Sequence, residues 1–247
     1  MIAHQVEAIV LRTWPIHEAD QIVSLFTRDY GKIKGVAKSS ARSRRRFGGA
    51  MEPMTHVRAS YAEKPRQDLV RLDSFDIVSS PLSAPVDYAR AAALAFFAEV
   101  LEETLPDHDP QDAVFRLLVA VLAYTRNGSI WMPVTYFSLW TTRLMGWLPE
   151  FGICVDCGEP LHGQPAYFHP QHDGLFCFQH RRAGSFTLSP ESQALAARIL
   201  RTPVPTLAEE AWPRQRAADL RRFSIQALER HIDRRLTSAI ALNQIGA

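Results

Sequence analysis

Hydrophobic and polar positions follow two different periods along the chain, and the period changes near residue 80. Before that point, five short runs are rich in β-branched and aromatic residues, and turn-forming residues separate them. The runs are Val6 to Trp14, Ile22 to Thr27, Ile33 to Ala37, Met54 to Tyr61 and Leu69 to Val78. Five short strands without an intervening helical pattern predict a small barrel or a strongly bent sheet. An OB-type barrel is a natural candidate, and SH3-like barrels have the same number of strands.

After residue 80, the apolar positions recur at helical spacing. The first predicted helix runs from Val86 to Leu105, and Glu99, Glu102 and Glu103 supply its polar side. Asp109 followed by Pro110 predicts the start of a second helix, because a capping carboxylate precedes a proline at the first helical position. This second helix is predicted to end at Tyr124. Three further helices are predicted, from Pro133 to Trp147, from Ser189 to Arg201 and from Pro213 to Ala239.

These patterns predict an α+β chain of several domains. We expect an OB-type β-barrel in residues 1–80, a helical domain in residues 81–150, an inserted zinc knuckle in residues 151–185, and C-terminal helices in residues 186–247 that pack on the helical domain. The chain has 247 residues, of which 47% are apolar, so it can bury a sizeable core.

Neither a membrane span nor a secretory signal is visible in the sequence. The most apolar windows are short and contain Glu99 or Arg116, whereas a membrane helix requires about 20 apolar residues. The N-terminal residues lack both a cationic start and a continuous apolar stretch. The sequence therefore predicts a cytoplasmic protein, and three cysteines fit a disulfide framework poorly in that reducing compartment.

The segment from Arg28 to Gly49, which we call the basic tract, concentrates positive charge. It holds eight cations and one carboxylate, Asp29, a net charge of +7 in a protein whose total is +2. The cations are Arg28, Lys32, Lys34, Lys38, Arg42, Arg44, Arg45 and Arg46. The tract is either a solvated charged loop or a site for a polyanion, for which phosphate is the obvious candidate. We expect Lys32 and Lys34 at fixed positions on a strand, and residues 38–46 as a mobile loop that orders on its ligand.

Two pairs of metal-ligating residues occur on either side of an aromatic and glycine-containing insert. Cys154 and Cys157 form the first pair, and Cys177 and His180 form the second with the same spacing. Four thiolate or imidazole ligands from two tight turns can close a tetrahedral shell around one zinc ion. Alternatives for the fourth ligand lie in the insert, namely His162, His169 and His172. We expect His180, because it mirrors the first pair.

No set of catalytic residues is evident. A hydrolytic zinc would keep an open position for water beside a general-base carboxylate, and the chain has no His-x-Glu arrangement of that kind. Walker-type glycine loops and Gly-x-Ser-x-Gly elbows are also absent from the sequence.

Two further groups of side chains have a structural and a nucleic-acid interpretation. The arginines of the last predicted helix, Arg221, Arg222, Arg230, Arg234 and Arg235, form either a solvated helical face or an extension of the cationic track, and we favour the first. Tyr30, Phe47 and Tyr61 lie near the tract and could stack on bases, and we favour packing in the barrel.

Several short segments of the N-terminal part occur in a characteristic order, and a Cys-x-x-Cys knuckle precedes the last helices. The segments are Ala8-Ile-Val-Leu-Arg-Thr13, Glu18-Ala-Asp20, Leu25-Phe-Thr27, Tyr30-Gly31-Lys32, Ala37-Lys38 and Met51-Glu-Pro53. In these features the sequence resembles the RecO family of bacterial recombination mediators. The resemblance covers essentially the whole chain. In the helical middle of the chain, only the order and the general character of the elements match the family.

The resemblance implies a protein without enzymatic activity that binds single- and double-stranded DNA. It implies annealing of complementary strands, including strands coated by single-stranded-DNA-binding protein (SSB), and cooperation with RecR in loading RecA. The implied DNA-binding residues are Lys32, Lys34, Lys38, Arg42, Arg44, Arg45 and Arg46. The resemblance also implies docking of the SSB tail on the helical domain and one structural Zn²⁺ per chain. Many members have four cysteines in the knuckle, whereas this chain has His180 in the last place.

Two other classes of function fit parts of the sequence. One is a protein-interaction adaptor whose basic tract docks on acidic protein surfaces, with DNA binding secondary. The other is a zinc-dependent nucleic-acid enzyme. A single-stranded DNA affinity that barely changes with salt concentration would favour the adaptor, because it would exclude phosphate contact by the tract. A strand-processing activity that requires the zinc ligands would identify the enzyme.

Overall fold

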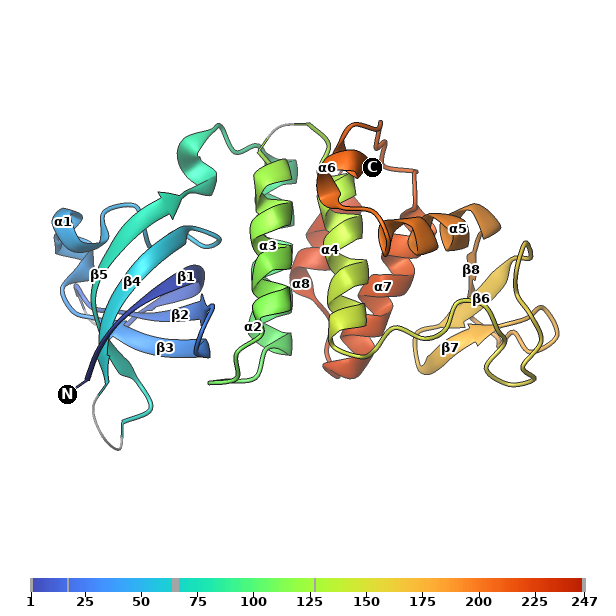
Figure 1. The fold of residues 1–247 in the computed structure, drawn as a ribbon, viewed down its shortest axis with the longest axis horizontal. Helices are drawn as coiled ribbons and strands as arrows, with labels where there is room; N and C mark the ends of the chain where they lie inside the picture. Colours follow the sequence, from blue (N-terminus) through green and yellow to red (C-terminus); the bar gives the residue numbers. More distant parts are fainter. Residues whose placement is uncertain (1, 17, 64–66, 127, 246–247) are drawn as a thin grey trace. The chain divides into compact units, whose positions relative to one another are not determined.

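The computed structural model describes residues 2–16, 18–63, 67–126 and 128–245, and it divides the chain into two compact units (Figure 1). The first unit comprises Met1–Arg126 and Thr237–Ala247, and the second comprises Asn127–Leu236. That the four predicted segments are separate domains stays a prediction. None of the helices in the described part of the chain combines the length and apolar character that a membrane span requires.

Five strands of the first unit form a closed barrel in the order β1-β2-β3-β5-β4. They are β1 (Ile2–Pro15), β2 (Gln21–Thr27), β3 (Gly31–Ala37), β4 (His56–Glu63) and β5 (Val70–Ser79). Neighbouring strands are antiparallel except β3 and β5, which are parallel. Each of the five predicted strands is present.

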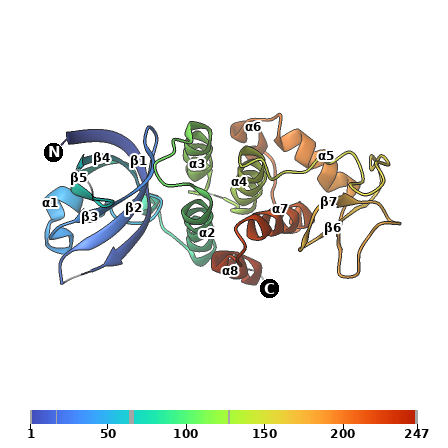
Figure 2. The same cartoon turned by 90° about the horizontal axis from the view of Figure 1, so that it is seen from below.

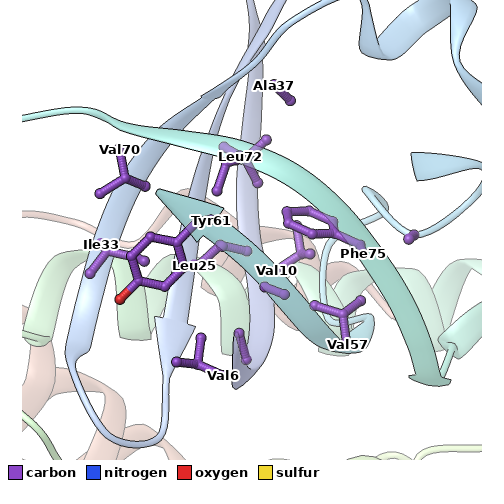
Figure 3. Close-up of a cluster of buried hydrophobic side chains, with 14 of the residues drawn as sticks. Val6, Val10, Leu25, Ile33, Ala37, Val57, Tyr61, Val70, Leu72 and Phe75 are labelled. Atoms are coloured by element: carbon purple, nitrogen blue, oxygen red, sulfur yellow. The ribbon is translucent and has the colours of Figure 1, made fainter. Parts of the chain in front are cut away.

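Alternating side chains of these strands fill the barrel. Val10, Leu25, Ile33 and Leu72 belong to a buried apolar cluster inside it (Figure 3). A Cβ atom at Gly35 would lie 2.7 Å from side-chain atoms of Leu72, so the close approach of β3 and β5 requires glycine there. The hydrophobic alternation of the strands therefore produces the core that the sequence predicts.

The helices of the first unit are α2 (Tyr88–Thr104), α3 (Asp112–Tyr124) and α8 (Thr237–Gln244). α8 packs along α2 (Figure 2). Asp87 caps α2 by accepting a 2.7 Å hydrogen bond from the Arg90 N–H. The predicted start of α3, with Asp109 as the cap and Pro110 as the first helical residue, is wrong by two residues, because Gln111 precedes the helix and Asp112 begins it. Residues before Asp112 instead contact the barrel: the N–H of His108 donates to the Lys32 carbonyl at 2.9 Å, and a tertiary contact of this kind overrides a local capping preference.

The second unit contains α4 (Trp131–Leu144), α5 (Pro190–Ile199), α6 (Val204–Ala208) and α7 (Ala218–His231), with a small sheet in the order β7-β6-β8. Its strands are β6 (Ala166–His169), β7 (His172–Phe176) and β8 (Phe186–Leu188).

The single helix predicted from Pro213 to Ala239 is wrong, because α7 ends at His231 and α8 begins at Thr237. Asp233 between them has φ of 51°, which no α-helix tolerates. Glu229 accepts a 2.9 Å hydrogen bond from the Leu236 N–H and so stabilises the break.

Candidate metal centre and nucleic-acid interface

Two tight turns of the second unit present the four predicted metal ligands. In the first turn, the Gly158 N–H donates to the Cys154 carbonyl at 2.8 Å, so Cys154 and Cys157 lie on one loop. In the second, which follows β7, the His180 N–H donates to the Cys177 carbonyl at 3.2 Å. The equal spacing in the sequence therefore becomes two similar loops that face one another.

The four ligand atoms lie within 4.8 Å of one another. The Sγ atoms of Cys157 and Cys177 are 3.9 Å apart, and His180 Nδ1 lies 3.1 Å from Cys177 Sγ and 3.9 Å from Cys154 Sγ. Two sulfurs that bind one zinc ion at about 2.3 Å in a tetrahedron are separated by roughly 3.8 Å. The cluster therefore fits a single tetrahedral ion, and these four residues could bind one metal ion.

Electrostatics at the cluster favour a metal-binding thiolate. Burial opposes ionisation of Cys154, but hydrogen bonds from the backbone N–H groups of Cys177, Cys157 and Asp156 outweigh it and lower the pKa of Cys154 to about 7. The pKa of Cys157 is raised, because burial and the neighbouring sulfurs outweigh the N–H of Glu159. One thiol of the cluster is thus ready to lose its proton near neutral pH.

The other histidines of the insert lie outside this cluster of described residues. The rings of His169 and His172 pair with each other at a centroid distance of 4.9 Å. The ring of His162 lies against Gly152. Of the four histidines that could complete the set, the structure therefore brings His180 to the cysteines.

The basic tract forms two short helices after β3, namely η1 (Ser40–Arg42) and α1 (Arg44–Phe47). η1 contacts the β1–β2 turn, where the Ser39 N–H donates to Asp20 Oδ1 at 2.7 Å. The side chain of Phe47 is buried in the barrel and packs edge-to-face on Phe75 of β5 at 5.3 Å. Residues 38–46 thus contain helical turns, and their predicted ordering on a ligand stays a prediction. Phe47, the last residue of α1, directly follows the charged run and anchors it. Figure 2 shows α1 beside the barrel strands.

The tract presents several cations on its surface. Lys38 and Arg45 are exposed. Arg42 is also exposed and lies 3.4 Å from a carboxylate oxygen of Glu18. Arg46 donates to the Lys38 carbonyl at 2.6 Å, and Arg44 lies on α1, where its backbone alone is described. Cations held on helical turns of this kind can contact a polyanion with little ordering cost.

Lys32 and Lys34 instead contact α2 and the segment after it. Lys32 is buried, and its Nζ donates to the Glu102 carbonyl at 2.7 Å and lies 3.4 Å from Asp107 Oδ1. Lys34 Nζ lies 3.6 Å from Glu102 Oε1, and that carboxylate also accepts a 2.6 Å hydrogen bond from Ser24. These lysines stabilise the first unit internally. The sequence does not identify these acidic partners, although residues 81–150 hold eight acids against four arginines.

Arginines of α7 are also used internally. Arg221 is buried, donates to the Arg216 carbonyl at 2.7 Å and to Thr135 Oγ1 at 3.1 Å, and lies over the Trp131 ring at 4.7 Å. Burial lowers the pKa of Arg221 to about 10, so it remains protonated at neutral pH. Arg230 pairs with Asp173. The predicted solvated helical face is therefore wrong for Arg221, because its side chain is buried and bonded within the second unit.

Two of the three aromatic candidates are core residues. Phe47 and Tyr61 are 2% and 1% exposed. Tyr30 is 40% exposed and contacts the His4 ring edge-to-face at 5.2 Å. Packing in the barrel is thus confirmed for Phe47 and Tyr61.

These features define a class of protein: one chain that combines a closed five-stranded barrel, helices and a Cys₃His cluster. The barrel carries the exposed cations of η1 and α1, which we call the cationic turn (residues 38–46). Comparison with known proteins narrows the class. The family described as "Recombination protein O N terminal" matches residues 1–81, and "Recombination protein O C terminal" matches residues 85–239.

Several curated relatives carry the name "DNA repair protein RecO". The chain is 54% identical to the one from Koribacter versatilis (strain Ellin345) over 241 residues, which cover 98% of each chain. It is 32% identical to the one from Anaeromyxobacter sp. (strain K), with coverage of 96% of this chain and 95% of the relative. The relative from Myxococcus xanthus (strain DK1622) is 32% identical over 97% of both chains. The chain therefore belongs to the RecO family of DNA repair proteins.

Proposed function

We propose that the chain is a recombination mediator in DNA repair. It binds single- and double-stranded DNA, anneals complementary strands, including SSB-coated ones, and promotes RecA loading together with RecR. The observation that carries the proposal is the exposed cationic turn, held by Phe47 on a closed barrel, in a chain 54% identical to a DNA repair protein RecO.

The strand order supports an OB-type barrel. β1 pairs with both β2 and β4, and the parallel pair of β3 and β5 completes the closure. OB-type barrels commonly bind single-stranded nucleic acid with a cationic groove and aromatic side chains.

Annealing requires charge neutralisation more than chemistry. Two phosphate chains approach one another only when cations screen them, and each cation that contacts a phosphate releases a bound counterion. We assign phosphate contact to Lys38, Arg42, Arg44, Arg45 and Arg46. Lys34, half-exposed beside Glu102, lies at the margin of this surface. The burial of Lys32 supports a structural role for that residue.

The Cys₃His cluster is proposed to hold one structural Zn²⁺. Four protein ligands close the tetrahedral shell and leave no position for a reactive water, so the ion acts as a folding element. The proposed mediator is accordingly not an enzyme.

Its proposed partners are DNA, RecR and the SSB tail, with a functional link to RecA. The proposed location is the cytoplasm, in association with the nucleoid.

A strand-annealing assay tests the function. Complementary oligonucleotides coated with SSB are mixed with the protein in the absence of nucleotide. We define the tract variant as Lys38→Gln with Arg45→Gln, because both side chains are exposed. The protein is expected to accelerate annealing and the tract variant to accelerate it less. If the protein leaves the rate unchanged, the proposed function is wrong.

A further inference from the structure

The outer surface of β1, β2 and β3 carries a half-buried apolar row. Trp14 is the register partner of Ile22, and Ile22 is the partner of Val36, so the three side chains lie on one side of the sheet. All three are partly exposed. Their neighbours along the strands, such as Val23 and Ala37, belong to the interior cluster. The row therefore faces outward from the barrel.

A β-bulge turns Trp14 to this side. The register of β1 and β2 shifts between Val10 and Arg12, so Leu11 is an additional residue in β1. Val10 lies in the interior cluster, and uninterrupted alternation would place residues 12 and 14 inside as well. After the bulge, Arg12 pairs with Ser24 and Trp14 with Ile22, on the outer side. Bulges commonly re-aim side chains near functional sites.

Cations border the row on both sides. The Arg12 guanidinium lies over the Trp14 ring, with its central carbon 5.1 Å from the ring centroid. Lys34 is in register with Ser24, which is the partner of Arg12. Lys38 follows Val36 by two residues and is exposed, at the start of the cationic turn.

The acids next to this surface already have partners. Glu102 accepts hydrogen bonds from Ser24 and lies beside Lys34. Asp20 accepts the Ser39 N–H, and Glu18 lies 3.4 Å from Arg42. The four cations Arg12, Lys34, Lys38 and Arg42 outnumber the three acids Glu18, Asp20 and Glu102 by one. The surface around Trp14 thus combines a partly exposed aromatic ring with a small excess of positive charge.

We propose that this surface, which we call the Trp14 face (Arg12, Trp14, Ile22 and Val36), binds unpaired bases of single-stranded nucleic acid. A base stacks on Trp14 while the cations on either side neutralise its phosphates. The inference rests on the proposed DNA binding. It adds that the Trp14 face contacts the bases, whereas the tract contacts the phosphates. Duplex bases are already stacked and paired, so the Trp14 face selects single strands without selecting a sequence.

Two substitutions separate base contact from phosphate contact. Trp14→Leu keeps an apolar side chain in the row but removes the aromatic ring, and Trp14→Phe keeps a smaller ring. Each protein is titrated with a labelled oligothymidylate, with an abasic oligonucleotide of the same length, and with a duplex.

Trp14→Leu is expected to weaken oligothymidylate binding by about tenfold, because stacking on an aromatic ring contributes substantially per base. Binding of the abasic oligonucleotide and of the duplex is expected to stay unchanged, and Trp14→Phe is expected to restore most of the loss. An equal loss on oligothymidylate and on the abasic oligonucleotide would overturn the proposal, as would no loss on either. The first result would leave Trp14 with a structural role, and the second would leave the face to another occupant, such as a protein.

Fluorescence provides a measurement on the unsubstituted ring. Trp14 is the sole tryptophan of residues 1–126, so its emission is obtained as the difference between the protein and Trp14→Phe. Oligothymidylate is expected to quench this emission and the abasic oligonucleotide is not. If oligothymidylate binds without quenching, base contact by the Trp14 face is wrong, whereas phosphate contact by the basic tract is not contradicted. A protein that binds none of the three probes would overturn the proposed function as well.

Discussion

The ammonium group of Lys32 on β3 donates a 2.7 Å hydrogen bond to the main-chain oxygen of Glu102 on α2. The same group lies 3.4 Å from Asp107. A cation of the basic tract thus links the barrel to a helix of its own unit, so the charge of the tract has both structural and surface roles.

Replacing Lys32 is expected to change stability and not DNA affinity. Lys32→Met keeps the apolar stem but leaves the Glu102 carbonyl without this donor, which is expected to cost about 2 kcal/mol of unfolding free energy. Chemical denaturation measures the loss. Lys38→Met is the matched control, because that side chain is exposed and is expected to lower DNA affinity without loss of stability. A stable Lys32→Met protein with weakened DNA binding would contradict this assignment.

Glu99 of α2 binds the N-terminus of α8 and is expected to make stability depend on pH. Its carboxylate accepts hydrogen bonds from Thr237 N at 2.9 Å, Thr237 Oγ1 at 2.8 Å and Ser238 N at 2.7 Å, and from Ser238 Oγ. Burial opposes ionisation, but these hydrogen bonds outweigh it and lower the pKa of Glu99. The stabilisation is therefore complete above the ordinary glutamate pKa and is lost as the pH falls through the lowered value.

Glu99→Gln is expected to cost about 1 to 2 kcal/mol at neutral pH, because the charged cap at the start of α8 is lost. The difference in unfolding free energy between the two proteins is measured from pH 7 to pH 3. It is expected to shrink as the pH falls below the ordinary glutamate pKa of about 4.3, and to disappear once the native carboxylate, whose pKa is lower, is protonated. A difference that stays constant over this range would exclude the capping role.

The Cys₃His cluster is expected to bind one zinc ion that stabilises the second unit. Cys157→Ser and His180→Gln are expected to lose the metal and to lower the melting temperature on the order of 10 °C. His169→Gln is the control, because that ring pairs with His172 and lies outside the cluster. Metal content and thermal unfolding are measured together. Full metal content in His180→Gln would show that another residue completes the set.

Arg221 is expected to be a core residue of the second unit. Arg221→Lys retains the charge but cannot supply the same fork of hydrogen bonds to the Arg216 carbonyl and Thr135. We expect a loss of about 2 kcal/mol in unfolding free energy with no change in DNA affinity. The neighbouring Arg222→Lys, at an exposed position, is expected to have little effect on stability. Weakened DNA binding by a stable Arg221→Lys protein would contradict this prediction and would indicate that α7 contacts DNA.

The local sequence predicts the strands, helices and ligand pairs of this chain better than it predicts the tertiary contacts between them. Alternation and turn residues define the five barrel strands, and equal ligand spacing defines the Cys₃His cluster. The start of α3 is different because Lys32 holds the preceding segment, and that contact joins residues far apart in sequence. The break between α7 and α8 depends on a left-handed residue, Asp233, which a helical hydrophobic pattern does not reveal.

Charge and aromatic character likewise do not show which side chains reach the surface. Lys32 and Lys38 have the same chemistry in the sequence, but the first is buried and the second is exposed. Trp14 was predicted only as part of a strand. Its outward direction follows from one additional residue, Leu11, in the register of β1 and β2.

The salt dependence of single-stranded DNA affinity tests the central claim, phosphate contact by the basic tract, most directly. The logarithm of affinity is plotted against the logarithm of salt concentration for the protein, for the tract variant, and for Arg58→Gln with Arg116→Gln. This control makes the same change in charge at exposed positions of the first unit outside the tract and the Trp14 face. The protein is expected to show a steep negative slope, the tract variant a slope flatter by about 1.4, and the control an unchanged slope. A tract variant with the slope of the unsubstituted protein would contradict phosphate contact by the tract.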